Sequence, residues 1–310
     1  MQAEQKKIGG ILHTGDQYVI PLFQRHYSWE KEHWERLRKD IWALMENGSK
    51  PVHFLGPLVC TYLPKLPGNN TVYQLIDGQQ RITTLTILLS ALRDVARSRN
   101  LHELADEVTE DFLMFKRRQG PDRYKVLPRL GDREVLTEMI EGHSLDRFTE
   151  SGVFAAWKYF RRHVEHWARK DSERQLRRLL DAVSSKLSLV AILIDGENPY
   201  EIFESLNSTG LPLKESDLIR NYVFMQIPLE NQQDFSDQHW KALEDMFEAT
   251  DSEPEAEMTP FYRDYLMRDG QYIKEDATFV EFKKATAKAV SQPEILVNEH
   301  GGTCIPVWNR

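Results

Sequence analysis

The chain has 310 residues, of which 41% are hydrophobic and 28% charged, a composition typical of globular proteins long enough for more than one packed unit. Two cysteines exclude a disulfide scaffold and a cysteine-rich zinc site, and they favour the reducing cytoplasm. The net charge of -8 combines a basic stretch, residues 1–190, with an acidic one, residues 191–310, so the chain can still offer a basic face to a nucleic acid. No apolar run is long enough to span a membrane.

The first elements are a short strand and a helix joined by an irregular aromatic stretch. A strand is expected at residues 17–20, because the chain is apolar there and Pro21 follows. In the stretch 22–29, Arg25 lies among aromatic side chains and needs a partner, either a ligand phosphate or a buried carboxylate. A helix is expected from Trp29 to Met45, with an apolar stripe that favours core packing.

Two further strands, 53–62 and 71–76, lead into the word DGQQRITT at residues 77–84. Helical spacing of apolar residues follows from Leu85, so the word is predicted to form a turn from a strand into a helix. A glycine, unpaired helix N–H groups and the cation Arg81 suit a phosphate, while Asp77 suits a hydrated Mg²⁺. A turn whose polar residues merely cap the helix is the alternative, and the Walker pattern is absent.

The segment 112–133 mixes basic and aromatic residues, a pattern that suits the phosphates and bases of a nucleic acid. Neighbouring acidic residues leave a second reading open, a solvated face of paired charges. The cations predicted to contact DNA are Arg117, Arg118, Arg123 and Lys125.

The remainder predicts helices at 154–169 and 173–185, a buried strand at 187–194, and an acidic helical region after residue 226. The fold class is therefore α+β: a small mixed sheet of four strands with a helical insertion at about 85–185. Arg220 and its neighbour Asn221 are polar residues on a mostly apolar helix and require interior partners.

Five words then occur in order, and together they resemble the N-terminal domain of GmrSD-type and SspE-type modification-dependent restriction proteins. The words are IPLFQRHYSW (20–29), HFLG (53–56), IDGQQRITTL (76–85), FESLNSTG (203–210) and DLIRNY (217–222). The resemblance implies a ParB/sulfiredoxin-like domain over residues 1–225 that binds and hydrolyses a nucleoside triphosphate with Mg²⁺. A helical region, 226–310, would lead to an HNH nuclease domain.

The resemblance also implies roles for individual residues. Asp77, Gln79, Gln80 and Arg81 would be catalytic, with Asp77 holding the metal. The nucleotide would be bound by Gln24, Arg25, Gly78, Thr83, Asn207 and Arg220. Tyr27 and Trp29 are predicted to sense the DNA modification, with core packing as the alternative for both.

The implied function is the NTP-hydrolysing, DNA-modification-sensing module of an anti-phage restriction system, acting on double-stranded, modified DNA. The alternative is a nucleotide-gated, ParB-like DNA-binding switch in which hydrolysis is incidental. No HNH pattern follows residue 225, so we expect the nuclease on a partner subunit or on a longer chain of which this is a fragment. A homodimer stays open.

Overall fold

The computed structural model divides the chain into two compact units, residues 1–21 with 26–199 and residues 22–25 with 200–310. The residues described are 2–22, 24–46, 52–63, 71–128, 130–194, 214–227, 231–241, 243, 247, 254–268 and 270–290.

The first unit is built on a six-stranded mixed sheet with the order β1-β6-β3-β4-β2-β5. Its strands are β1 (Gln2–Lys7), β2 (Gln17–Val19), β3 (His53–Leu63), β4 (Val72–Asp77), β5 (Val126–Leu127) and β6 (Leu187–Ile194). Pairing is antiparallel between β1 and β6 and between β3 and β4, and parallel at the other three junctions. The sheet and the surrounding helices confirm the α+β class.

Four strands were predicted and two were not. The strand β1 has the sequence QAEQKK and pairs only with β6, so it is a mainly exposed edge with no apolar pattern to reveal it. The strand β5 has two residues and comes from within the predicted helical insertion, where it extends the sheet beside β2. The insertion is therefore part of the sheet as well as a helical cover.

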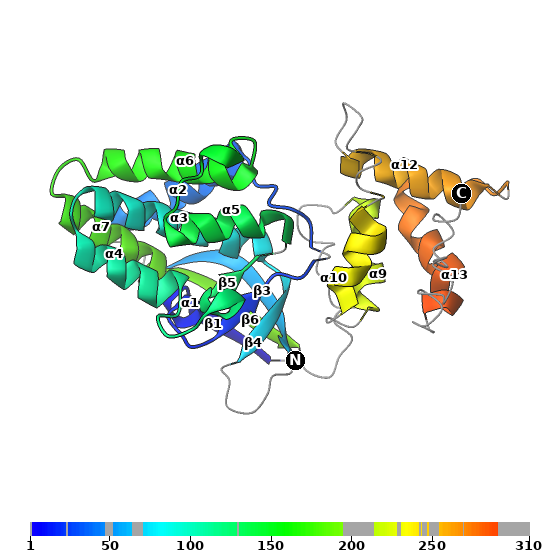
Figure 1. The fold of residues 1–310 in the computed structure, drawn as a ribbon, viewed down its shortest axis with the longest axis horizontal. Helices are drawn as coiled ribbons and strands as arrows, with labels where there is room; N and C mark the ends of the chain where they lie inside the picture. Colours follow the sequence, from blue (N-terminus) through cyan, green and yellow to red (C-terminus); the bar gives the residue numbers. More distant parts are fainter. Residues whose placement is uncertain are drawn as a thin grey trace. The chain divides into compact units, whose positions relative to one another are not determined.

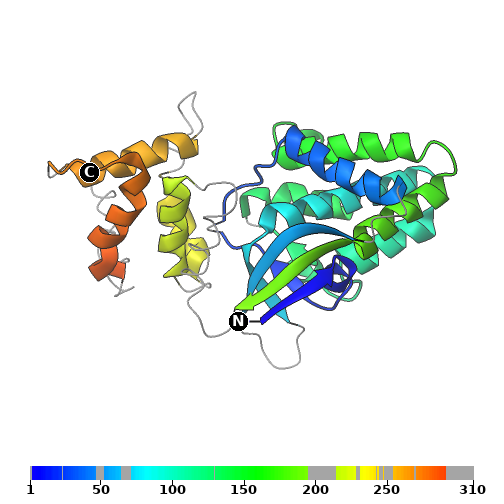
Figure 2. The same cartoon turned by 180° about the vertical axis from the view of Figure 1, so that it is seen from behind.

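Helices of the first unit gather on one side of this sheet, as Figures 1 and 2 show from opposite directions. They are α1 (Gly9–Leu12), α2 (Lys31–Glu46), α3 (Gln79–Ser98), α4 (His102–Val108), α5 (Leu130–Glu141), α6 (Gly152–Trp167) and α7 (Ser172–Asp181). Single π-helical turns continue α4 over Thr109–Leu113 and α7 over Ala182–Lys186. None of the described helices, in either unit, is both long and apolar enough to cross a membrane.

The central helix is α3, which is buried on every side from its first turn to Ala96 except at a few positions. Its fully buried Arg93 donates to the carbonyls of Met139 and Ile140 at the C-terminal end of α5. The adjacent Asp94 accepts a hydrogen bond of 2.9 Å from the Trp157 indole of α6. These contacts hold the C-terminal half of α3 against α5 and α6, while its N-terminus follows directly from the end of β4 through Gly78.

Lys125 corrects one sequence-based expectation, because it is buried and cannot reach a DNA phosphate. It is 3% exposed, and its ammonium donates to the carbonyls of Leu12, Thr14 and Asp111 at 2.8, 3.2 and 2.7 Å. Burial lowers its pKa to about 8, so the side chain keeps three protons at neutral pH for three acceptors. Lys125 thus anchors the insertion to the segment before β2.

The second unit is helical, with α9 (Glu215–Met225), α10 (Gln232–Phe235), α12 (Pro254–Met267) and α13 (Thr278–Val290). The aromatic ring of Tyr222 on α9 packs against Phe279 and Phe282 of α13, with centroids 6.1 and 6.5 Å away. This packing groups α9 with the C-terminal helices. By their internal contacts the compact units therefore divide near residue 199. The division into a domain of residues 1–225 and a region of residues 226–310 stays a prediction.

Candidate phosphate-binding site

The word DGQQRITT forms the end of β4 and the first turns of α3. Gly78 lies between them with φ +94° and ψ 7°, a left-handed conformation that side chains other than glycine rarely adopt. A Cβ at this position would lie 2.8 Å from Leu58 Cδ1 and 3.1 Å from the Pro57 carbonyl oxygen. Glycine is therefore required both by the backbone conformation and by the closeness of β3.

Helix α3 begins at Gln79, so the two glutamines and Arg81 belong to its first turn. No side chain caps this end of the helix. The first intrahelical backbone bond is from Ile82 N to Gly78 O, at 3.1 Å, which leaves the N–H groups of the three preceding residues unused by the helix. Unused N–H groups and the positive end of the helix dipole favour an anion at this position.

The Arg81 guanidinium lies beside these N–H groups and is held by two contacts. It donates to Asp77 Oδ2 at 3.0 Å and to the Leu55 carbonyl at 3.3 Å. Its side chain is 19% exposed, so it is largely enclosed and still reachable from solvent. A guanidinium has five N–H donors, and two contacts leave others for a ligand.

Gly56 of β3 makes room for this guanidinium. Its φ is +113°, and a Cβ built on it would overlap Arg81 Nη1. The pairing of β3 with β6 shifts register between Phe54 and Pro57, so the backbone bulges where the guanidinium passes. The words HFLG and DGQQR, separate in the sequence, thus form one site.

The carboxylate of Asp77 fits a magnesium ion whose other ligands are phosphate oxygens and water. Asp77 is 28% exposed on its side chain, and only Oδ2 is bonded to Arg81. Mg²⁺ commonly takes one or two carboxylates with phosphate oxygens and water, so one free carboxylate oxygen is sufficient. Within the described residues, no cluster of three or more His, Cys, Asp and Glu side chains is arranged for a metal.

The two glutamines differ in their contacts. Gln80 accepts from Ser28 N at 3.0 Å and donates to the His26 carbonyl at 2.9 Å, so both ends of its amide are bonded to one backbone segment. Gln79 is 8% exposed, and no described residue bonds to its amide. Gln79 is therefore the glutamine that can contact a ligand, while Gln80 connects the turn to residues 26–28. Thr83 lies one turn further along α3 and is 4% exposed.

Tyr27, a predicted sensor, is part of the same connection. Its hydroxyl lies 2.8 Å from Thr84 Oγ1 of α3 and accepts from the Trp34 indole of α2 at 2.9 Å. Its backbone N–H donates to Asp132 Oδ2 at 3.0 Å. Burial raises the pKa of this hydroxyl. The contacts give Tyr27 the packing role that the sequence left open as its alternative, and its role in sensing stays a prediction.

Trp29, the second predicted sensor, packs partly buried against the core and stacks on His33 with ring centroids 5.6 Å apart. This is the packing that the sequence left open as its alternative.

Other residues predicted to bind the nucleotide are grouped with the second unit or lie outside the described residues. Gln24 and Arg25 belong to the second unit, and Gln24 is 4% exposed. Arg220 is also in that unit, with its guanidinium 5.6 Å from the ring centroids of both Phe224 and Trp240. Asn207 and the word around it lie outside the described residues.

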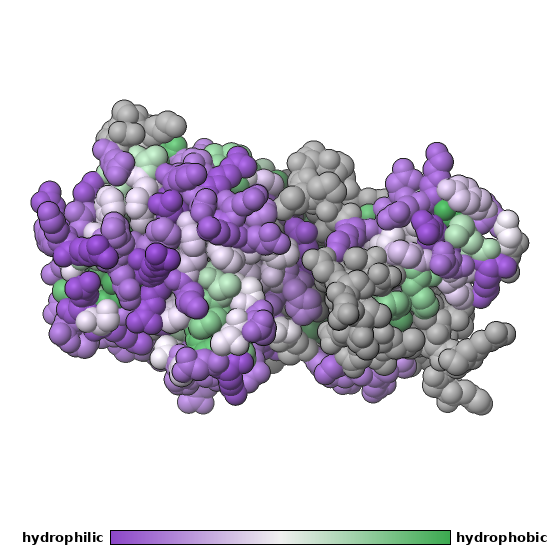
Figure 3. All heavy atoms as spheres, turned by 90° about the horizontal axis from the view of Figure 1, so that it is seen from above, coloured by the Kyte–Doolittle hydropathy of each residue, from purple (hydrophilic) through white to green (hydrophobic). Residues whose placement is uncertain are grey.

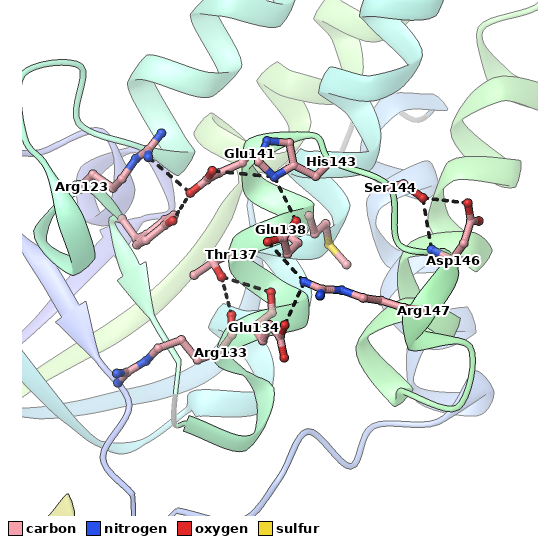
Figure 4. A network of polar contacts seen from close by, with 12 residues as sticks. Arg123, Arg133, Glu134, Thr137, Glu138, Glu141, His143, Ser144, Asp146 and Arg147 are labelled. Carbon is pink, nitrogen blue, oxygen red and sulfur yellow. Dashed lines mark hydrogen bonds and ion pairs between the residues drawn. The ribbon is translucent and has the colours of Figure 1, made fainter.

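Most described cations of the 112–133 segment form hydrogen bonds, ion pairs or ring contacts with neighbouring groups. The Arg118 guanidinium lies 3.5 Å from the Phe115 ring centroid and donates to the Gly15 carbonyl. Arg123 pairs with Glu141 of α5 at 3.3 Å, within a network of carboxylates that Figure 4 shows. Arg117 is exposed. The paired face that the sequence left as an alternative describes this segment better than an open basic groove.

Comparison with known families gives one match. The model described as GmrSD restriction endonuclease, N-terminal domain, matches residues 8–224, a range that includes β3, β4 and the whole of α3. This confirms the resemblance drawn from the five sequence words. A search of curated proteins found no match.

The site geometry predicts that Gly56→Ala destabilises the protein by about 1–3 kcal/mol, through a strained φ and displacement of the Arg81 guanidinium. In an Arg81→Ala background the same substitution should cost less, because no guanidinium remains to be displaced. Urea unfolding of both single variants and the double variant measures this coupling. Gly10→Ala is the control, since nothing lies within 4 Å of its Cβ. Strictly additive losses would contradict the geometry.

Proposed function

This chain belongs to the family of GmrSD restriction endonuclease N-terminal domains, and we propose that it hydrolyses a nucleoside triphosphate and senses modified DNA within a restriction system. Family membership supports a role in restriction. The observation that carries the finer proposal is the single site formed by Arg81, Asp77, Gly56 and the uncapped N-terminus of α3.

The site supplies what a triphosphate requires. The N–H groups of the first turn and the remaining donors of Arg81 would bind the oxygens of the terminal phosphates. The contacts to Leu55 and Asp77 hold the guanidinium before the nucleotide arrives, so little reorganisation is needed as charge develops on the transferred phosphoryl group.

In the reaction, water attacks the terminal phosphorus and the bond to the bridging oxygen breaks, so the diphosphate leaves with the electron pair. The proton of the attacking water passes to solvent or to phosphate. Gln79, whose amide no described residue occupies, would orient this water. Asp77 would hold a Mg²⁺ ion, which supplies charge neutralisation at the phosphates.

A physical connection between the turn and residues 26–28 supports modification sensing. Gln80 contacts both ends of that segment, and Tyr27 at its centre contacts Thr84. A shift of the segment on binding DNA would therefore move groups within the first two turns of α3. Modified DNA would stimulate hydrolysis through this connection.

We predict that Arg81→Ala lowers the rate of phosphate release by about 10²-fold or more, because the main fixed positive charge of the site is lost. Its melting curve should stay close to that of the wild type, since the partly exposed side chain fills no apolar cavity. Steady-state phosphate release with each of the four NTPs measures the effect. Arg174→Ala on α7, where the arginine is exposed, is the matched control.

An Arg81→Ala variant that melts normally and hydrolyses at the wild-type rate would contradict the assignment. Tight nucleotide binding by the wild type with slow phosphate release, whatever duplex is added, would identify the chain instead as a nucleotide-gated DNA switch.

A second prediction concerns the connection through Tyr27. Tyr27→Phe keeps the packed ring and removes the hydroxyl that contacts Thr84 and Trp34. Stimulation of hydrolysis by a modified duplex, typically about 5-fold or more for coupled sites, should be lost or strongly reduced. Tyr124→Phe is the control, because that hydroxyl bonds to Glu141 of α5. Full stimulation in a folded Tyr27→Phe variant would show that the modification is sensed elsewhere.

A further inference from the structure

A groove of about 1030 Å³ lies in the first unit between α2, α6 and the C-terminal end of α3. On α6 the exposed residues Lys158, Arg162 and His166 are spaced four apart and therefore lie on one face of the helix, and Arg169 follows just beyond its end. The helices α2 and α6 lie at the top of this unit in Figure 1. Figure 3, which views the molecule from above, shows a mainly hydrophilic surface there.

The groove is strongly basic although the whole chain has a net charge of -8. Glu35 and Glu165 are the acidic residues that line it. The cations that line it come from α2, the end of α3, and α6 with the residues that follow it: Lys31, Arg38, Arg99, Lys158, Arg162 and Arg169. This excess of positive charge is local and lies far along α3 from the phosphate turn, at the other end of the same helix.

Side chains inside the groove contact one another, while the cations at its rim, Lys158, Arg162 and Arg169, are exposed. The Arg38 guanidinium donates to the Tyr159 hydroxyl at 2.9 Å, and the Tyr159 ring lies 4.5 Å from that of His163. The pKa of His163 is lowered, first by burial and then by the nearby positive charges of Arg38 and Arg162. Arg38 and Arg162 thus lie close enough to His163 for their positive charges to add to the effect of burial.

We propose that this groove binds the sugar–phosphate backbone of duplex DNA. From Lys158 to the end of α6 at Trp167 the helical rise of about 1.5 Å per residue covers roughly 13 Å, over which one strand of B-DNA carries roughly four phosphates, and Arg169 follows just beyond. The cations along the groove would contact successive phosphates of one strand. Such contacts do not distinguish one base from another. The inference rests on the proposed function, in which DNA is the partner.

The groove replaces the 112–133 segment as the basic surface for DNA. In that segment Lys125 is buried, and Arg118 and Arg123 are engaged by neighbouring groups. Lys158 and Arg162 of α6, and Arg169 just beyond its end, are exposed. The only acidic side chain of α6, Glu165, pairs with Arg161 at 3.1 Å. A DNA backbone can therefore displace solvent there without breaking a buried ion pair.

The test measures binding of a fluorescent, unmodified DNA duplex of roughly 20 base pairs to the full chain without nucleotide, between about 50 and 200 mM salt. The groove variant is Lys158→Gln/Arg162→Gln/Arg169→Gln. The matched control, Lys116→Gln/Arg117→Gln/Arg123→Gln, removes three charges from the 112–133 segment. The melting curves of both variants check that the fold is intact.

The groove variant should bind at least about tenfold more weakly, and the slope of log affinity against log salt should fall by about two to three. The control should stay within about twofold of the wild type. Equal binding by wild type and groove variant, or an equal loss in the control, would overturn the proposal. So would a wild type that binds only the matching RNA duplex, or no duplex at all.

The readout is separate from that of the proposed hydrolysis. Nucleotide is absent from the binding assay, so failure of the groove leaves the Arg81 result untouched. Loss of hydrolysis in Arg81→Ala with an unaffected DNA affinity would in turn leave the groove in place.

Discussion

The phosphate site depends on one close contact, in which the Arg81 guanidinium lies against the backbone of Gly56. Arg81 can contact both Asp77 and the Leu55 carbonyl only because residue 56 has no side chain and the backbone bulges beside it. A second glycine fixes where α3 begins, since Gly78 must take a left-handed conformation against Leu58. A cation, a carboxylate and unused helix N–H groups are thereby brought to one point at the edge of the sheet.

The polar residues of the turn then divide into two groups by their contacts. Arg81 and Asp77 remain partly exposed, and the amide of Gln79 has no partner among the described residues. Gln80 and Thr84 face residues 26–28 and bind them. The end of β4 and the first two turns of α3 therefore present one set of groups to a ligand and another to the segment that precedes α2, which is the physical basis for coupling the two.

The sequence predicted those parts of the fold that an apolar pattern specifies, namely the four inner strands and the helices α2, α3, α6 and α7. It missed β1, whose side chains are polar because the strand lies at an edge, and β5, which is too short for any pattern. The phosphate turn was recognisable because glycine, arginine and aspartate stand together. The role of Gly56 was not, because the contact with Arg81 joins distant residues. Lys125 was misassigned since a buried lysine and an exposed one look alike in sequence.

The central claim is that a nucleotide phosphate binds at the N-terminus of α3. Hydrogen exchange of the backbone amides measures this directly, because the N–H groups of Gln79, Gln80 and Arg81 have no partner within the helix. A non-hydrolysable NTP analogue with Mg²⁺ should slow exchange in peptides covering residues 78–84, and the slowing should be absent in Arg81→Ala. Nucleotide binding that protects other peptides and leaves 78–84 unchanged would contradict the account.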